Sequence, residues 1–199
     1  MKRILSLIGV VLVVGLLWLR WRPLDPCPGG PDGPYENSRI GQVDEKGTLK
    51  DGCWDGPYEM YHKDGQLWTK GSWSNGVRDG PWEDYHENGQ LDRKGSWSNG
   101  EPDGPWEYYY ENGQLDRKGS LKDGERHGPW EWYHENGQLG GKGSYKDGEM
   151  DGPWEEYYYE NGQLGWKGSH SNGEQCGEWF DNGETVTYDP CPPDLEGAV

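Results

Sequence analysis

The chain has little of what usually fills a protein core. Of its 199 residues only one is Phe, whereas 34 are Gly and 14 are Pro, 48 residues in all. So much Gly and Pro without a period would be typical of disorder. The 13 Trp and 13 Tyr recur in fixed columns instead, which indicates an ordered fold with deliberately placed turns.

The sequence also lacks the motifs that mark catalytic and metal sites. Its cysteines have no C-x-x-C spacing, and its Asp-Gly turns lack the D-x-D-x-D-G pattern of a calcium loop. No Gly-rich phosphate loop precedes a helix, and no Ser is placed with a His and an Asp outside the repeating pattern. We therefore expect a protein that is not an enzyme and that holds no metal or cofactor.

Basic residues are scarce beyond the N-terminus. Residues 1–22 hold four of the 19 Lys and Arg and no acid, so the rest of the chain has 15 basic against 36 acidic residues, a net charge of −21. Such a surface repels phosphate backbones, and we expect no nucleic-acid partner. The acids fall largely at turns, where they keep a ribbon with exposed edges soluble.

What the sequence does contain is a tandem repeat. One copy, GPWEYYYENGQLDRKGSLKDGERH, fills residues 104–127, and most copies around it share its 24-residue period. The copy from Gly152 is one residue longer, and degenerate copies flank the array, as capping units often do. We divide the chain into an N-terminal segment 1–22, a Pro/Gly linker 23–32, a repeat array 33–188 (degenerate cap 33–55, repeats 56–79, 80–103, 104–127, 128–151 and 152–176, partial cap 177–188) and a tail 189–199.

Each copy is predicted to be a β-hairpin. A Gly-Pro pair opens every full copy and Gly recurs within it, which excludes a helical solenoid. Counting that Gly as position 1, positions 9 and 10 are Asn-Gly or Asp-Gly, the pair favoured in a type I′ turn. This turn would set position 3 opposite 16, 4 opposite 15 and 7 opposite 12. A second turn at positions 19–21 leads to the next copy, so the expected fold is all-β, an elongated meander of tandem hairpins.

This register assigns side chains to two faces. On one face, Glu at position 4 lies opposite Lys at position 15 of the same copy (Glu59–Lys70, Glu83–Lys94, Glu107–Lys118, Glu131–Lys142, Glu156–Lys167). On the other, a ring at position 3 covers the Gly at position 16, and Leu at position 12 joins it with the His or Tyr at position 7. We expect the position-3 rings to form a structural aromatic ladder that includes Trp82, Trp106, Trp130 and Trp154.

Two further columns are aromatic. Tyr at position 6 lies on the Glu–Lys face and is our candidate contact surface: Tyr61, Tyr85, Tyr109, Tyr133 and Tyr158. At position 7, His62, His86 and His134 alternate with Tyr in the other copies. A catalytic or metal-binding His would not alternate with Tyr in equivalent units, so the position-7 side chains are expected to be structural.

The run KGSWSNGEPDGPWEYYYENGQL resembles the MORN repeat, in the bacterial variant with the pattern G-x-W-x-x-Y-x-x-N-G followed by G-x-W/Y-x-x-G-x-x-x-G. The resemblance extends in tandem over most of residues 33–188. It implies a β-ribbon that serves as a scaffold, binds proteins and in some members associates with membranes. One bacterial branch of the family carries an antitoxin label.

The N-terminal segment MKRILSLIGVVLVVGLLWLRWR is predicted to be a transmembrane helix. Its apolar run, Ile4–Leu19, is bracketed by basic residues, and Trp18 and Trp21 suit the membrane interface. No small-x-small cleavage site follows, which favours an uncleaved signal-anchor over a cleaved signal peptide. Lipidation of Cys27 is a further alternative.

The four cysteines, Cys27, Cys53, Cys176 and Cys191, bracket the two degenerate end units. Of the three connectivities, the local pairs would staple the hairpins that have a neighbour on one side only. We favour disulfides over free thiols. Disulfides imply an oxidising compartment, with the repeat domain periplasmic or extracellular.

Together these features favour a single-pass, membrane-anchored interaction scaffold that binds a protein partner at the cell envelope. Stacked aromatic columns also suit a sugar polymer, so a glycan or cell-wall binding module is the alternative. An antitoxin-like protein is a further alternative, and it would require a cytoplasmic repeat domain.

Overall fold

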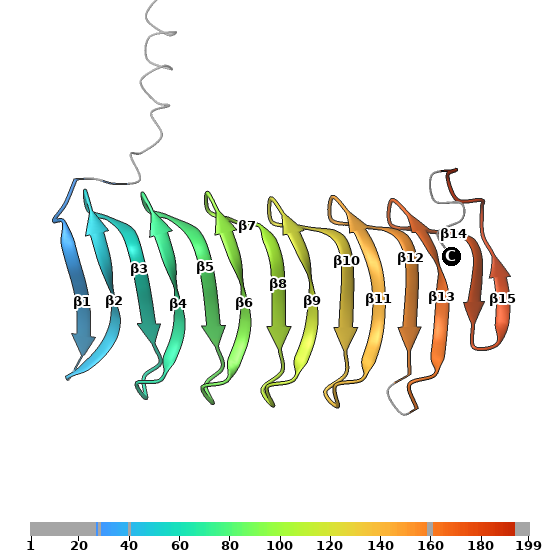
Figure 1. The fold of residues 1–199 in the computed structure, drawn as a ribbon, viewed down its shortest axis with the longest axis horizontal. Helices are drawn as coiled ribbons and strands as arrows, with labels where there is room; N and C mark the ends of the chain where they lie inside the picture. Colours follow the sequence, from blue (N-terminus) through green and yellow to red (C-terminus); the bar gives the residue numbers. More distant parts are fainter. Residues whose placement is uncertain (1–26, 28, 40, 159–160, 194–199) are drawn as a thin grey trace, which may run out of the picture.

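The computed structural model describes residues 27, 29–39, 41–158 and 161–193. Within them the chain forms one antiparallel sheet in which strands follow one another in chain order, drawn out as the long ribbon of Figure 1. The predicted all-β meander is confirmed. None of these residues belongs to a helix long and apolar enough to cross a membrane. The helix predicted at 1–22 lies outside the described residues.

The strands are short and similar in length, as the repeat requires. The first eight are β1 (Gly33–Arg39), β2 (Gln42–Lys50), β3 (Cys53–Tyr61), β4 (Leu67–Ser74), β5 (Val77–Tyr85), β6 (Leu91–Ser98), β7 (Glu101–Pro102) and β8 (Gly104–Tyr109). The rest are β9 (Leu115–Lys122), β10 (Glu125–Tyr133), β11 (Leu139–Lys146), β12 (Glu149–Tyr157), β13 (Leu164–Ser171), β14 (Glu174–Asp181) and β15 (Glu184–Thr187). The short β7 pairs with β6 alone.

The type I′ turns lie at the opposite end of the hairpins from the one predicted. Asn75 and Gly76, which join β4 to β5, both have positive φ (49° and 81°). The equivalent Asn-Gly or Asp-Gly pairs between the other copies also have positive φ at both residues. A two-residue loop between strands needs this geometry at both positions. The type I′ turn therefore connects one copy to the next.

The Asn-Gly pair at positions 9 and 10 lies in a longer loop. Between β5 and β6 the His86 N–H donates to the Gln90 carbonyl (2.8 Å) and the Gly89 N–H to the His86 carbonyl (2.9 Å). Gly89 has positive φ and Asn88 does not; Asn88 Oδ1 instead accepts a hydrogen bond from the Gln90 N–H. This is a three-residue loop with Gly in the left-handed conformation, so the predicted type I′ turn at this place was wrong.

The longer loop is accompanied by a bulge that moves the Leu column to the other face. Met60 pairs with Thr69 as predicted, but Tyr61 pairs with Leu67 and leaves Trp68 without an opposite residue. Positions 3 and 4 keep the predicted register, whereas position 7 does not face position 12. Since paired residues share a face, Leu67 lies beside Tyr61 and not beside the position-3 rings.

The extra residue of the fifth copy lies in its loop and not in its strands. Glu155, not Glu156, pairs with Lys167, and Tyr157 pairs with Leu164. Tyr157 therefore takes the place that the sequence assigned to Tyr158. The predictions for Glu156 and Tyr158 were wrong by one residue, because the insertion was counted before position 4.

Side-chain packing is strongest between units. Each position-16 Gly faces the position-3 ring of its own hairpin on one side and that of the next hairpin on the other. A Cβ atom at Gly119 would lie 2.2 Å from Cδ2 of Trp130, which belongs to the following unit. The same ring-on-Gly contact joins Gly71 to Trp82, Gly95 to Trp106, Gly143 to Trp154 and Gly168 to Trp179. The ring therefore covers the Gly of the preceding unit, which corrects the expectation of a contact within one hairpin.

These rings form the core of the sheet. Trp82, Trp106, Trp130 and Trp154 are buried, with 2, 2, 1 and 7% of their surface exposed. Tyr58 and Trp179 continue the column toward the two ends. Within the described part of the chain no second layer covers this sheet, which buries large aromatic side chains by stacking units along its own face.

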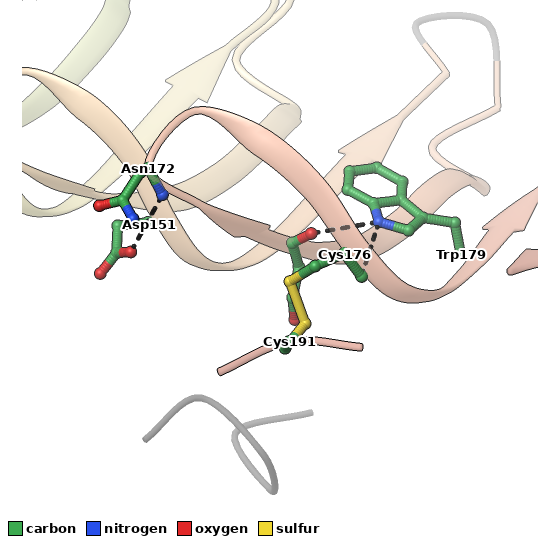
Figure 2. The surroundings of a disulfide bond; sticks show 6 residues. Asp151, Asn172, Cys176, Trp179 and Cys191 are labelled. Carbon is green, nitrogen blue, oxygen red and sulfur yellow. Dashed lines mark hydrogen bonds between the residues drawn. A yellow bond between two sulfur atoms is a disulfide. The ribbon is translucent and has the colours of Figure 1, made fainter. Parts of the chain in front are cut away.

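Two disulfides close the ends of the described ribbon. Cys27 is bonded to Cys53 (Cα–Cα 5.0 Å) and Cys176 to Cys191 (Cα–Cα 4.9 Å), the local pairs. Figure 2 shows the second one beside Trp179, whose indole N–H reaches the Ser169 and Cys176 carbonyls (3.1 and 3.2 Å). The disulfide therefore fixes the segment around Cys191 close to Trp179, the buried ring nearest this end of the ribbon.

Candidate functional site

The face opposite the buried rings carries a Tyr–Glu–Lys triad in each unit; we call it the tyrosine face. In the central unit Tyr109 Oη donates a hydrogen bond to Glu107, and Lys94 Nζ lies 2.9 Å from Glu107 Oε2 and 5.8 Å from the centre of the Tyr109 ring. The triads are Lys46–Glu59–Tyr61, Lys70–Glu83–Tyr85, Lys94–Glu107–Tyr109, Lys118–Glu131–Tyr133 and Lys142–Glu155–Tyr157.

Each triad crosses the boundary between two units. The Cα register places Glu83 opposite Lys94 in its own hairpin, as predicted, and also opposite Lys70 of the preceding one. The ion pair forms with the preceding Lys: Lys70 Nζ lies 2.8 Å from Glu83 Oε2. The ladder of alternating Lys and Glu is therefore continuous along the sheet, and its closest contacts join neighbouring units, as the ring-on-Gly contacts do.

The triad holds its groups in their ordinary charge states over a wide pH range. Hydrogen bonds from Tyr109 and Lys94 lower the pKa of Glu107, and the bond to Glu107 raises the pKa of Lys94 to about 12. Burial, followed by the hydrogen bond to Glu107, raises the pKa of Tyr109. At neutral pH the face thus presents a phenol and a paired carboxylate and ammonium, with no net charge per triad.

The triads form a row along the sheet and repeat at a fixed distance. Two strands per unit at about 4.8 Å per strand place equivalent Tyr rings roughly 10 Å apart. Four of the predicted contact residues lie in this row, and Tyr157 completes it in place of Tyr158. These five tyrosines are half-buried, so part of each is accessible to solvent while its hydroxyl is hydrogen-bonded to Glu.

The His–Tyr alternation at position 7 has a structural explanation. His86 Nε2 lies 2.9 Å from the Tyr109 carbonyl oxygen, and in the next unit Tyr110 Oη donates to the Tyr133 carbonyl at 2.7 Å. Each side chain contacts the equivalent carbonyl oxygen one unit further on, so either His or Tyr can make this contact. Tyr158, predicted as a contact residue, belongs to this column and donates to Asn182.

The other face, which we call the tryptophan face, carries a second row beside the buried rings. It is formed by positions 5 and 14, whose residues vary between copies, so that no constant column of the repeat marks them in the sequence. Arg93 pairs there with Asp84 through a 2.6 Å contact, and Arg117 lies 4.4 Å from the centre of the Tyr108 ring. The same face exposes Trp166, 45% of whose surface is accessible.

Among the residues that the structure describes, no group of three or more His, Cys, Asp and Glu is arranged to hold a metal ion. Some of the described histidines pack within the sheet. His170, for example, lies between Trp154 and Trp179, with ring centres 5.4 and 4.9 Å away.

The repeats match a known family. A model described as the MORN repeat variant matches residues 54–75, 78–99, 102–123 and 126–147. The chain therefore carries four tandem MORN repeats of the variant type, as the resemblance indicated. Repeats of this family are commonly modules that bind proteins or membranes.

Comparison with other proteins adds little to this assignment. A search of curated proteins found none that matches the chain. Among solved structures, the crystal structure of TarM matches with a TM-score of 0.29 and 10% identity, over 86% of this chain and 24% of that one. The chain thus spans about a quarter of the TarM chain, and a likeness at this level says nothing about function.

Proposed function

We propose that the protein is a non-catalytic interaction scaffold that binds a protein partner at the cell envelope through its tyrosine face. The observation that carries this proposal is the row of five identical Tyr–Glu–Lys triads at a constant spacing. Tyr supplies contact area together with a hydroxyl at little entropic cost, and it is enriched in binding surfaces for that reason. A regular row of such groups suits an extended partner.

The envelope location is proposed from the two ends of the chain. The described chain contains two disulfides, and disulfides persist in oxidising compartments. Residues 1–22 have the composition of a membrane anchor. Protease digestion of whole cells tests this part. Cleavage of the repeat domain from outside the cytoplasmic membrane is expected, and a fully protected domain in cells with permeable outer layers would contradict it.

Capture of envelope proteins tests the partner. Oxidised full-length protein is immobilised, exposed to detergent-solubilised envelope from the source cell, and the bound proteins are identified by mass spectrometry. We expect a small set of proteins that is lost when Tyr85, Tyr109 and Tyr133 are changed together to Ser. The control is Tyr110→His at position 7, where other copies of the repeat have His. This variant should still bind the same proteins.

A glycan-binding module is the second candidate, and exposed indoles are the observation that favours it. Trp68 and Trp166 are 46 and 45% accessible, which is unusual for Trp and suits stacking on sugar rings. Sedimentation with purified cell wall separates the two functions. Retention by the wall that is lost in a Trp68→Ala, Trp166→Ala variant, with no protein captured, would replace the scaffold with this alternative.

A further inference from the structure

One position in the row on the tryptophan face has no side chain. Arg93 pairs across the strands with Asp84 on one side and Tyr108 on the other. Arg117, one unit further on, pairs with Tyr108 and then with Trp132. In the next unit the equivalent residue is Gly141. The row therefore has two arginines followed by a gap.

The neighbours of the gap are of the two kinds that hold the arginines. Gly141 pairs with Trp132 on one side and with Glu156 on the other. A carboxylate holds Arg93 through its contact with Asp84, and an aromatic ring holds Arg117. Around Gly141 the sheet thus supplies both a ring and a carboxylate, and the guanidinium that would lie between them is missing.

An open pocket of about 390 Å³ occupies this place. Trp132, Tyr145 and Trp154 line it, with ring centres 5.0 Å apart for the two Trp and 6.1 Å apart for Trp132 and Tyr145. The Trp154 indole N–H donates to Glu156 Oε1 at 3.0 Å, which fixes that carboxylate beside the rings. Asp116 also lines the pocket, but its carboxylate is paired with Arg117 at 3.3 Å, which leaves Glu156 as the acid beside the rings. None of the described lining residues is Lys or Arg.

Two arginines of this chain lie nearby, and both are already engaged. Arg117, opposite Trp132, lies 3.3 Å from Asp116 Oδ2 and 4.4 Å from the centre of the Tyr108 ring. Arg126 donates to the Tyr145 hydroxyl at 2.7 Å, and its guanidinium lies 5.0 Å from the centre of the Trp130 ring. Arg126 does not line the pocket. Trp132 and Glu156 are therefore the pair that remains available to an incoming cation.

We infer that the pocket at Gly141 binds the guanidinium group of an arginine side chain presented by a partner protein. A flat guanidinium stacks on an indole face and donates hydrogen bonds in its own plane to a carboxylate, which a compact ammonium cannot do at once. The chemistry of the pocket is inferred from this chain alone, whereas the source of the arginine rests on the proposed scaffold function.

The test uses the full chain in detergent, titrated with ethylguanidinium and followed by the indole N–H signals of its tryptophans in NMR spectra. Saturable one-to-one binding that shifts the Trp132 and Trp154 signals is expected, with ethylammonium binding several-fold more weakly. The Gly141→Arg variant should fill the pocket with its own side chain and weaken binding about tenfold or more. Absence of saturable shifts, or equal binding by Gly141→Arg, would overturn the inference.

Two further variants keep the result interpretable if Gly141→Arg folds poorly. A Cβ atom at Gly141 would lie 3.1 Å from the Glu155 carbonyl oxygen, so the strand must give by a few tenths of an ångström. Glu156→Gln leaves the backbone as it is and should weaken binding by about fivefold or more. Arg93→Gly should open a matching pocket beside Asp84 and Tyr108 and raise the stoichiometry from one to two. A stoichiometry that stays at one would contradict the equivalence of the two positions.

The source of the guanidinium is tested with the peptide acetyl-Gly-Arg-Gly-amide. Binding that Gly141→Arg abolishes supports an arginine side chain, whereas exclusion of the peptide while ethylguanidinium binds would overturn the partner as the source. Capture from the envelope then separates this inference from the scaffold function. If partners are lost on changing the tyrosine face but are retained by Gly141→Arg, the scaffold function is supported. The inference that the pocket takes part in partner binding is then overturned.

Discussion

Gly119 lies directly under the indole of Trp130, across the boundary between two hairpins, where a Cβ atom on the glycine would come within 2.2 Å of the ring. The same contact recurs along the array, and the ion pairs on the tyrosine face cross the same boundaries. A hairpin therefore completes its contacts only when the next one is in place, which is the physical reason for the repetition.

Replacing Gly119 with Ala is expected to destabilise the protein by about 1–3 kcal/mol, because the methyl group cannot fit beneath a ring that is 1% exposed. Urea denaturation followed by Trp fluorescence measures the change. Gly141→Ala is the control, since its Cβ would approach no atom closer than 3.1 Å. Equal losses for the two variants would contradict the packing described.

The Lys–Glu ladder predicts an acid-side loss of stability. The folded protein lowers the pKa of Glu107 from its ordinary 4.5, chiefly through hydrogen bonds from Tyr109 and Lys94. The folded state therefore binds the proton less well than the unfolded state, so this stabilisation is complete above about pH 4.5 and fades as the pH falls through the folded-state pKa.

The Glu107→Gln variant should consequently be less stable than the wild type at pH 7, with a difference that shrinks toward pH 3. The free energy of unfolding of both proteins across this range is the measurement. Glu101→Gln, at an exposed residue outside the triads, is the matched control. A difference independent of pH would show that Glu107 acts through packing and not through its charge.

His170 makes a second pH prediction. Burial lowers its pKa below the ordinary 6.5, and its Nδ1 has no hydrogen-bond partner among the described residues. Because the unfolded chain takes up a proton more readily, stability should decrease as the pH falls below about 6.5. In the preceding unit Tyr145 takes the equivalent place, so His170→Tyr should keep the ring contacts and remove this dependence. Thermal unfolding at pH 5 and pH 8 tests it, and an unchanged pH dependence would exclude His170 as its source.

The disulfides are expected to stabilise the ends and leave the middle unaffected. Cys176 and Cys191 are 15 residues apart, a separation for which cross-linking contributes about 3 kcal/mol. Changing both to Ser should accelerate hydrogen exchange in β14 and β15, while β8 and β9 keep their protection. Loss of protection along the whole array would mean that the end units hold the remainder folded.

The repeat made much of this fold predictable. The period and the Asn-Gly pairs located both sets of turns, and the position-3 and position-4 register was correct in the four 24-residue copies. The type I′ turn was assigned to the wrong pair because the same dipeptide occurs in both loops: in one, Asn75 and Gly76 both adopt positive φ, and in the other only Gly89 does. Loop length, not composition, decides between them.

The partners of the side chains were less predictable. Each Glu has a Lys opposite it on both neighbouring strands, so the sequence could not distinguish contacts within a hairpin from contacts between hairpins. In the fifth copy the sequence does not show whether the extra residue precedes or follows the position-6 Tyr. Placing it before that Tyr led to the prediction of Tyr158, whereas the structure has Tyr157 at this position. The gap at Gly141 is visible in the sequence as a departure from Arg117, but its neighbours Trp132 and Glu156 appear only once the register is known.

The most direct test of this account is a pair of double-mutant cycles on Gly119. One combines Gly119→Ala with Trp130→Leu, the ring of the following unit, and the other combines it with Trp106→Leu, the residue opposite Gly119 in its own hairpin. We predict a coupling of about 1 kcal/mol or more with Trp130, the double variant losing less than the sum, and almost none with Trp106. Stronger coupling with Trp106 would place the specific packing within hairpins and contradict the account.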